Sequence, residues 1–289
     1  TRRNFHGGKF FHVGDGWRFD AFAVNPVNPV ARGGVDFDRY DSQPDEADHR
    51  RTLFGGYLAL TGDPMLSADL YMLYQDDERP RRNFAEGDRG LNGARVYGVL
   101  PADGDRRAWD YDLEGGYQWG SDLGRRVSAA FATAEVGHTW KKAPWSPRLA
   151  GLVYYGSGGD RDNETFYTYH PLGHAYWGII DNLAGQNLLD FSPQWAVNPT
   201  QKLNVVGAYH YFLKADGDGF LYNVAQTPVG PPTGEREIGH EVDLVATYAV
   251  NPNFNVQAGW AHFWYGEYVE QTLPRDDADF FYLQTTFNY

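Results

Sequence analysis

The sequence alternates between apolar and polar side chains over stretches of nine to twelve residues, and this pattern limits the fold more than any other feature. Residues 109–119 show it most clearly. Trp109 and Leu113 fall on one side of this stretch, whereas Asp112 and Glu114 fall on the other. A period of two residues is that of a pleated strand with two different faces. Helical periodicity is nearly absent, so the pattern predicts an all-β fold.

About twelve segments show the alternation, and each is expected to form a strand. They lie near residues 16–27, 51–62, 66–77, 93–101, 108–120, 126–140, 146–156, 187–198, 202–214, 237–249, 253–266 and 278–289. The connections alternate between short turns rich in Pro, Asn or Gly and long polar loops, except that 120–126 is short where a long one is due. If consecutive strands run up and down, the short turns gather at one edge of the sheet.

Strands of this length and chemistry are typical of a barrel that crosses a membrane. About 9–11 residues tilted by about 45° span the hydrocarbon, and lipid offers no partner for an edge strand, so the sheet must close. Trp and Tyr gather at strand ends, as at the two membrane interfaces. The mean hydropathy of −0.57 is compatible, because only every second residue needs to be apolar. We expect a transmembrane antiparallel up-and-down β-barrel of about twelve strands, one domain over residues 1–289 in a bacterial outer membrane.

A soluble β-sandwich that binds carbohydrate is the alternative fold, since its strands also alternate. Strands of soluble proteins average about 5–6 residues, which is shorter than most of these segments. The apolar faces here carry Trp and Tyr at their ends and small residues such as Ala130, Ala132 and Ala134 in the middle. A sandwich core would favour Val, Ile and Leu instead, so we prefer the barrel.

Composition excludes several classes of function. The formal net charge of −13 gives no basic surface for nucleic acid, and the absence of Cys excludes disulfides and thiolate metal sites. Nucleophile elbows, phosphate-binding Gly loops and His-Glu-x-x-His motifs are missing. We therefore expect no enzyme and no cofactor. A barrel-embedded enzyme acting on lipid or polysaccharide is the alternative function, with His210 or His262 as the residue to test.

Several segments carry a resemblance that covers nearly the whole chain. They are residues 16–22, 147–160, 173–178 with Asp181, 187–188, 198–203 and 282–287. In order and spacing they resemble the alginate-export family of Gram-negative outer-membrane porins. The resemblance implies a channel for the passive passage or export of a hydrophilic solute, such as the polysaccharide alginate. It implies as partners outer-membrane lipid and lipopolysaccharide, the solute, and an export protein in the periplasm.

Members of that family are longer, and the resemblance implies a full barrel of about eighteen strands. This chain is similar to about their C-terminal two-thirds. Either N-terminal strands of the full barrel are lacking here, or about twelve strands close a smaller barrel. Because barrel diameter grows with strand number, the smaller barrel would hold only a narrow pore.

The polar strand faces are predicted to line a wet interior. The pore-lining residues expected from the alternation are Arg18, Asp20, Asp69, Asp110, Asp112, Glu114, Glu135, Arg148, Asp190, Lys202, His210, Lys214, Glu241 and Asp243. Nine acids stand against four Lys or Arg in this set, which favours a cationic or uncharged solute. Two interpretations of Arg18 and Arg148 are open: each forms an ion pair with a neighbouring acid, or each contacts the solute.

The long loop 157–186 is rich in oxygen ligands. Asp160, Asp162, Asn163 and Glu164 offer a weak candidate for a Ca²⁺ site. Their spacing lacks the Gly and the distant Glu of an EF-hand loop, so a solvated acidic loop is favoured.

Two further features of this loop bear on function. His170 and His174 are four residues apart, yet Pro171 and Gly173 between them oppose the helix that would align two metal ligands. The length of the loop and its aromatic side chains permit it to fold into the mouth of the barrel and restrict it.

Overall fold

The fold comes from a computed structural model that describes residues 4–28, 46–78, 87–102, 107–122, 124–159, 161–169, 173–273 and 275–288. Within these ranges most of the regular structure is β. It is interrupted by one helix, α1 (Glu267–Thr272), and by two 3-10 turns, Asp162–Glu164 and Gly173–Ala175. None of these described helices is long and apolar enough to cross a membrane.

Thirteen long strands in the described ranges, together with the short β3 (Glu46–Ala47), form one antiparallel sheet. In sheet order the long strands are β1 (Asn4–Gly14), β2 (Trp17–Asn28), β4 (Arg51–Leu60), β5 (Ser67–Asp77), β6 (Gly87–Ala102), β7 (Arg107–Asp122), β8 (Arg125–Thr139), β9 (Arg148–Gly156), β10 (Leu188–Thr200), β11 (Leu203–Lys214), β14 (Glu237–Asn251), β15 (Phe254–Tyr265) and β16 (Ala278–Phe287). Sheet order follows chain order, so the topology is up-and-down, as expected. A small hairpin of β12 (Leu221–Tyr222) and β13 (Pro228–Val229) lies between β11 and β14.

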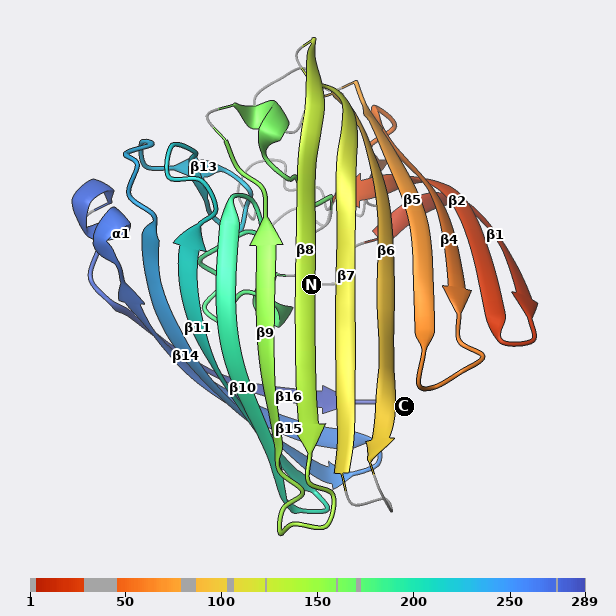
Figure 1. The fold of residues 1–289 in the computed structure, drawn as a ribbon, viewed down its shortest axis with the longest axis vertical. Coiled ribbons are helices and arrows are strands. Elements are labelled where there is room, and N and C mark those ends of the chain that lie inside the picture. Colours follow the sequence, from red (N-terminus) through yellow and green to blue (C-terminus); the bar gives the residue numbers. More distant parts are fainter. Residues whose placement is uncertain are drawn as a thin grey trace, which may run out of the picture.

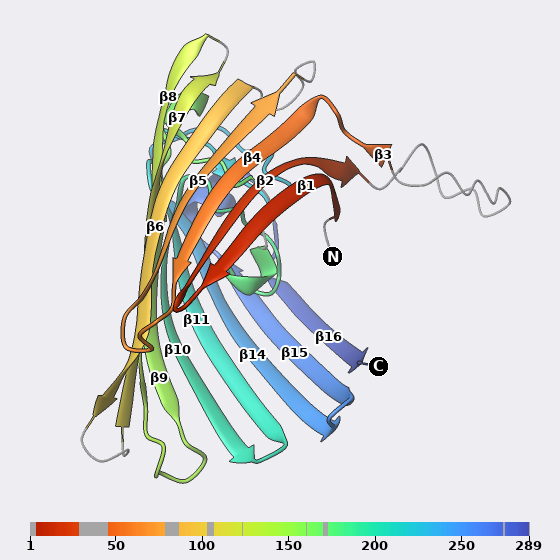
Figure 2. The same cartoon turned by 90° about the vertical axis from the view of Figure 1, so that its right-hand side faces the viewer.

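The sheet curves around a central space (Figures 1 and 2). Figure 2 shows β1 and β16 at the two ends of the curve, and no pairing joins these strands within the described ranges. The turns from β8 to β9, from β10 to β11 and from β14 to β15 lie at the lower edge in Figure 1. The loop after β9 and the hairpin β12–β13 lie toward the opposite edge. This segregation is the one that the alternating connection lengths predict.

The strand β1 is additional to the twelve that the alternation predicts. Its sequence contains two adjacent Gly residues and places Phe10 next to Phe11, so its two faces do not differ clearly. Pairing with β2 over its whole length nevertheless makes it a strand. Several boundaries also differ: β6 begins at Gly87 rather than near residue 93, and β7, β10 and β14 each continue about two residues further than expected.

The two faces of the sheet have opposite character. On the outer face of β7, Trp109 is 49% exposed and Leu113 is 41% exposed. On the inner face of the same strand, Gln118 is fully buried, as is Asp190 of β10. A soluble protein buries its large apolar side chains, whereas a membrane sheet presents them to lipid. The predicted alternation is therefore confirmed in the folded chain.

The buried apolar core lies inside the curve, where the connections fold onto the inner wall. Tyr154, Leu188, Phe212 and Phe263 come from four different strands and pack with Trp177 from the loop after β9. This core fixes the position of the loop relative to the inner face of the sheet. The position of the loop in turn determines the shape of the interior.

Candidate functional site

Most of the predicted pore-lining residues lie on the inner face of the sheet. Strand register places them there, because Asp20 lies opposite Tyr57, Asp69 opposite Arg95, and Arg95 opposite Glu114. The predicted residues at inner positions are Arg18, Asp20, Asp69, Asp110, Asp112, Glu114, Glu135, Arg148, Asp190, His210, Glu241 and Asp243.

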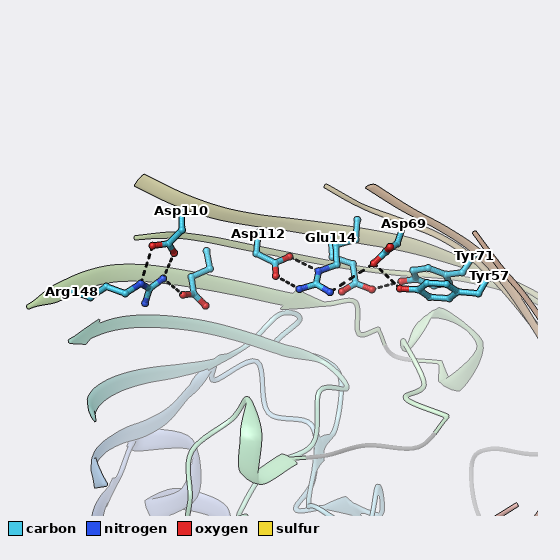
Figure 3. Close-up of polar contacts among 9 residues, drawn as sticks. Tyr57, Asp69, Tyr71, Asp110, Asp112, Glu114 and Arg148 are labelled. Atoms are coloured by element: carbon cyan, nitrogen blue, oxygen red, sulfur yellow. Dashed lines mark hydrogen bonds and ion pairs between the residues drawn. The ribbon is translucent and has the colours of Figure 1, made fainter. Parts of the chain in front are cut away.

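Arg148 is the centre of the first charged cluster on this wall (Figure 3). Its guanidinium pairs with Asp110 and lies 2.5 Å from Oε1 of Glu135. Nε of Arg148 donates a second bond to Asp110 at 3.1 Å. These contacts confirm that Arg148 forms ion pairs with neighbouring acids. They also compensate the negative charges of Asp110 and Glu135, which the sequence alone leaves unpaired.

Arg95 is the centre of the second cluster, and the sequence analysis missed it. Nε of Arg95 donates to Oδ1 of Asp112 at 2.7 Å, and its guanidinium lies 3.8 Å from Asp69. The same guanidinium lies over the ring of Tyr97, 4.5 Å from its centroid. Figure 3 shows the two clusters following one another along the wall.

Two tyrosines continue this row of polar contacts (Figure 3). The rings of Tyr57 and Tyr71 stack with their centroids 5.7 Å apart. The Tyr57 hydroxyl donates to Asp69 at 2.7 Å, and the Tyr71 hydroxyl donates to Glu114 at 2.5 Å. Within the described ranges no Lys or Arg forms an ion pair with Glu114.

Other bases pair with acids on the same face. Arg18 forms a two-point contact with Asp20 at 2.7 and 2.9 Å, which confirms its ion-pair interpretation, and Lys9 reaches Asp20 at 2.6 Å. Arg51 lies 3.9 Å from Asp77. The bases that the sequence analysis missed are Lys9, Arg51, Arg89 and Arg95. With these bases included, much of the wall from β1 to β9 is a series of ion pairs, while Glu114 and the acids around His210 form no ion pair with a described Lys or Arg.

The loop between β9 and β10 folds inward against this wall, as the sequence analysis allowed (Figure 2). The Gln118 side chain holds the backbone of Tyr167 from both sides, accepting from its N–H at 2.9 Å and donating to its carbonyl at 2.6 Å. Arg89 donates to the carbonyl of Thr165, and the hydroxyl of Tyr169 donates to the Arg89 carbonyl at 2.7 Å. Burial raises the pKa of Tyr169, so this donor stays protonated.

Two carboxylates hold the other half of the loop. Oε1 of Glu241 accepts the N–H of Ile180 at 2.9 Å, and Oδ2 of Asp243 accepts the N–H of Ile179 at 3.2 Å. Gly178 precedes them with φ of +81°, and a Cβ there would lie 2.4 Å from the Glu241 carboxyl carbon. Only Gly fits this position, because it combines a left-handed backbone with close approach of the carboxylate.

A histidine lies between buried acids beside this anchor. Nδ1 of His210 is 2.8 Å from Asp190, and its Nε2 is 3.7 Å from Asp243. All three side chains are buried. Register accounts for the grouping, since His210 lies opposite Glu241 on the next strand.

The loop and the wall line an open cavity of about 770 Å³. The wall contributes Tyr57, Tyr71 and Glu114, and the loop contributes Tyr167 and Trp177. Charged groups and aromatic rings therefore face the same space, which suits a hydroxylated solute with both polar and apolar surfaces.

Two predicted pore residues do not line the wall. Lys202 lies in the tight turn between β10 and β11, and its Nζ donates to the carbonyl of Val250 at 3.0 Å. Lys214, at the end of β11, is fully buried under the connections. It donates to the carbonyls of Gly217 and Gly219, and its Nζ lies over the ring of Tyr268. The alternation assigned both lysines to the pore-lining face. Lys202 instead lies in the turn, and Lys214 lies where other segments cover the sheet.

The metal candidates find no support where the structure describes them. Asp160 and His170 lie outside the described residues, as does the side chain of Asp162. Asn163 donates to the carbonyl of Arg126 at 2.7 Å. Across the described part of the chain, no group of three or more His, Asp or Glu is arranged to hold a metal ion.

Comparison with known proteins decides the family. The sequence model of the family described as "Alginate export" matches residues 1–282 of this chain. The chain belongs to the alginate export family. It is an integral outer-membrane channel for the passage of solute. No curated protein matches the sequence.

Solved structures with a similar fold are outer-membrane proteins of Pseudomonas aeruginosa. OccK5 (OpdH) has a TM-score of 0.61 at 10% identity, with 99% of this chain and 72% of that chain covered. OccK11 (OpdR) has a TM-score of 0.58 at 11% identity, with 98% and 70% covered. The outer membrane protein OprD has a TM-score of 0.58 at 14% identity, with 96% and 67% covered. At these identities the likeness concerns the fold.

Proposed function

We propose that this alginate export family member passes hydrophilic saccharides passively along its inner wall, and that the inward loop sets the size limit. The observation that carries the proposal is the clamp of the loop onto the wall by Gln118, Glu241 and Asp243. A loop held at both halves narrows the space beside the charged row and leaves it polar. Passive passage needs such a path to bind solutes weakly and at several points.

Conductance and liposome swelling test this proposal. Purified protein in a planar bilayer should carry current, and liposomes that contain it should swell in monosaccharides faster than in oligosaccharides of increasing length. Protein that is folded and inserted yet passes neither ions nor sugars would contradict the proposal.

The charge of the solute follows from the ion pairs. Arg18, Arg95 and Arg148 each contact at least one carboxylate, so their charge is locally compensated. A polyanion is attracted by unpaired cations. The row of pairs therefore supports an uncharged or cationic saccharide. Alginate is the second candidate, and the observation that favours it is family membership over residues 1–282. Inhibition of sugar-driven swelling by oligouronates would support alginate over the uncharged sugars.

We propose no catalytic role for this chain. Nδ1 of His210 contacts Asp190, and within the described ranges no Ser or Thr hydroxyl hydrogen-bonds to His210, as nucleophilic catalysis requires. His262 contacts Asp279 and packs against Trp264 on the outer face. Intact glycolipid and polysaccharide after incubation with the protein would bear this out.

The partners follow from the same arrangement. The aromatic outer face supports contact with outer-membrane lipid and lipopolysaccharide. The edge with the short turns is where we expect an export partner in the periplasm. Residues 1–289 are proposed to form one barrel domain, because the described long strands belong to one sheet.

A further inference from the structure

The cavity under the inward loop has an excess of negative charge. Its lining includes the carboxylates of Asp112, Glu114, Glu135 and Asp243, against one guanidinium, that of Arg95. Arg95 is already paired with Asp112, and Glu135 with Arg148 from outside the lining. Glu114 and Asp243 are therefore the two acids of the lining for which the described residues form no direct ion pair with an arginine, although Arg95 lies opposite Glu114 in register.

Glu114 lines the cavity from β7. Its one described hydrogen bond is with the Tyr71 hydroxyl, a neutral donor, on Oε1. The ring of Tyr71, stacked on Tyr57, lines the same space. A carboxylate beside the faces of aromatic rings attracts a cation in two ways, by charge and by the ring quadrupole.

Asp243 also lines the cavity, on β14, a strand separated from β7 by four others in sheet order. It is 6% exposed, and its Oδ1 has no hydrogen-bond partner among the described residues. The same is true of Oδ1 of Asp190 and Oε2 of Glu241 beside it. A buried acceptor without a partner is costly, so Oδ1 of Asp243, the acid of these three that lines the cavity, can accept a hydrogen bond from a donor placed there.

The positive charge facing these three acids is small. Two histidines lie near the group: His210 is 2.8 Å from Asp190 and 3.7 Å from Asp243, and His174, which contacts Asp181, lines the same cavity as Asp243. The loop contributes the N–H groups of Ile179 and Ile180, which are neutral donors. Neither histidine is a permanent cation, so a cationic donor can still be accepted on the cavity side, where Asp243 is the acid of this group that lines it.

The cavity lining also contains several aromatic side chains. Tyr167, Tyr176 and Trp177 of the loop line the cavity, as do Tyr57 and Tyr71 of the wall. Such rings pack on the apolar faces of sugars, and their hydroxyls offer hydrogen bonds to sugar hydroxyls. A metal ion is a poor candidate, since the described side chains do not converge as metal ligands.

We propose that this cavity binds a saccharide that carries an ammonium group, with Glu114 and Asp243 as alternative anchors for the ammonium and the aromatic walls holding the ring. The proposal rests on the proposed channel function and names its preferred solute class, an amino sugar in its cationic form. As a solute passes, its ammonium group would leave one carboxylate and bind the other. Two weak sites of this kind permit selectivity for the cation without holding it so tightly that passage stops.

Calorimetric titration of the purified protein in detergent tests the binding. Glucosamine hydrochloride, N-acetylglucosamine, glucuronate and methylammonium are each titrated at the same ionic strength. Glucosamine should bind about tenfold more tightly than N-acetylglucosamine, which has the same ring without the charge, and glucuronate more weakly still. Equal binding of glucosamine and N-acetylglucosamine overturns the proposal. If methylammonium binds as tightly as glucosamine, the proposed contact between the aromatic side chains and the sugar ring is overturned.

Variants locate the site. Glu114→Gln and Asp243→Asn should each weaken glucosamine binding by about threefold to tenfold and weaken N-acetylglucosamine binding by less, and the double variant should lose the preference. Glu270→Gln, which removes one acid from the exposed side of α1, should bind as the unaltered protein does. A double variant that keeps the preference overturns the assignment. If a variant does not fold, the ligand comparison on the unaltered protein still decides.

Failure of the proposal and failure of the channel function are distinguishable. Binding that prefers glucosamine in a protein without conductance would contradict the channel and keep the site. Normal conductance and swelling without a preference for glucosamine would contradict the site and keep the channel.

Discussion

Arg148 on β9 pairs with Asp110 on β7, and its guanidinium crosses the intervening strand β8 to reach it. Gly137 occupies the crossing point on β8 and lies opposite Asp110 in register. A Cβ at Gly137 would lie 2.3 Å from Nη2 of Arg148. The ion pair therefore depends on a third residue that makes no polar side-chain contact itself.

Replacing Gly137 by Val should push the Arg148 side chain away from Asp110. A double-mutant cycle on Arg148 and Asp110 should give a coupling free energy of about 0.2–1 kcal/mol in the unaltered protein, because both groups are partly exposed. In the Gly137→Val background the coupling should fall toward zero. Gly151→Ala is the control, since a Cβ there meets nothing within 4 Å. An unchanged coupling would show that the crossing is not needed.

The ion pairs predict the sign of a selectivity change. Asp110→Asn combined with Glu135→Gln leaves the Arg148 charge unpaired, so anions should gain permeability over cations. Arg148→Gln should have the opposite effect. Reversal potentials in a KCl gradient measure both. If the two variants shift the potential in the same direction, or neither does so, these side chains do not face the path.

Gly178 predicts how firmly the loop is held. Gly178→Ala adds a Cβ into contact with the Glu241 carboxylate at a left-handed backbone position, at a cost of about 1–2 kcal/mol. The loop should be displaced from its anchor, and single-channel conductance should rise. Gly151→Ala serves again as the control. A conductance equal to that of the unaltered protein would show that this anchor does not narrow the path.

The outer face predicts where charge is tolerated. Leu113→Arg should destabilise the protein in lipid vesicles by about 2–4 kcal/mol if the residue lies near the bilayer midplane. Thr133→Arg is the matched change on the inner face, opposite Glu114, and should be nearly neutral. Urea unfolding in vesicles measures both. Similar losses at the two positions would contradict the assignment of faces.

The sequence predicts the strand faces well because each face follows from local alternation. Along β7 the pattern is clean, so Asp110, Asp112 and Glu114 are assigned to the inner face without knowledge of their neighbours. In β1 the adjacent Phe10 and Phe11 break the pattern, and the strand is held instead by its pairing with β2.

The sequence does not predict which charges meet. Arg95 shares its inner face with Leu91 and Val99, so alternation within β6 does not mark it as a pore residue. Its contacts with Asp69 and Asp112 depend on the register of three strands, which the turns set. The position of Lys214 likewise depends on connections far along the chain, which fold over it.

The central claim is that alternate residues of the strands face lipid and water, and a cysteine scan of residues 109–118 tests it most directly. The protein has no Cys of its own, so each single replacement reports one position. With the protein in liposomes, a charged thiol reagent should label positions 110, 112 and 114 and leave 109, 111 and 113 unlabelled. Labelling without this period of two, or with the opposite phase, would contradict the account.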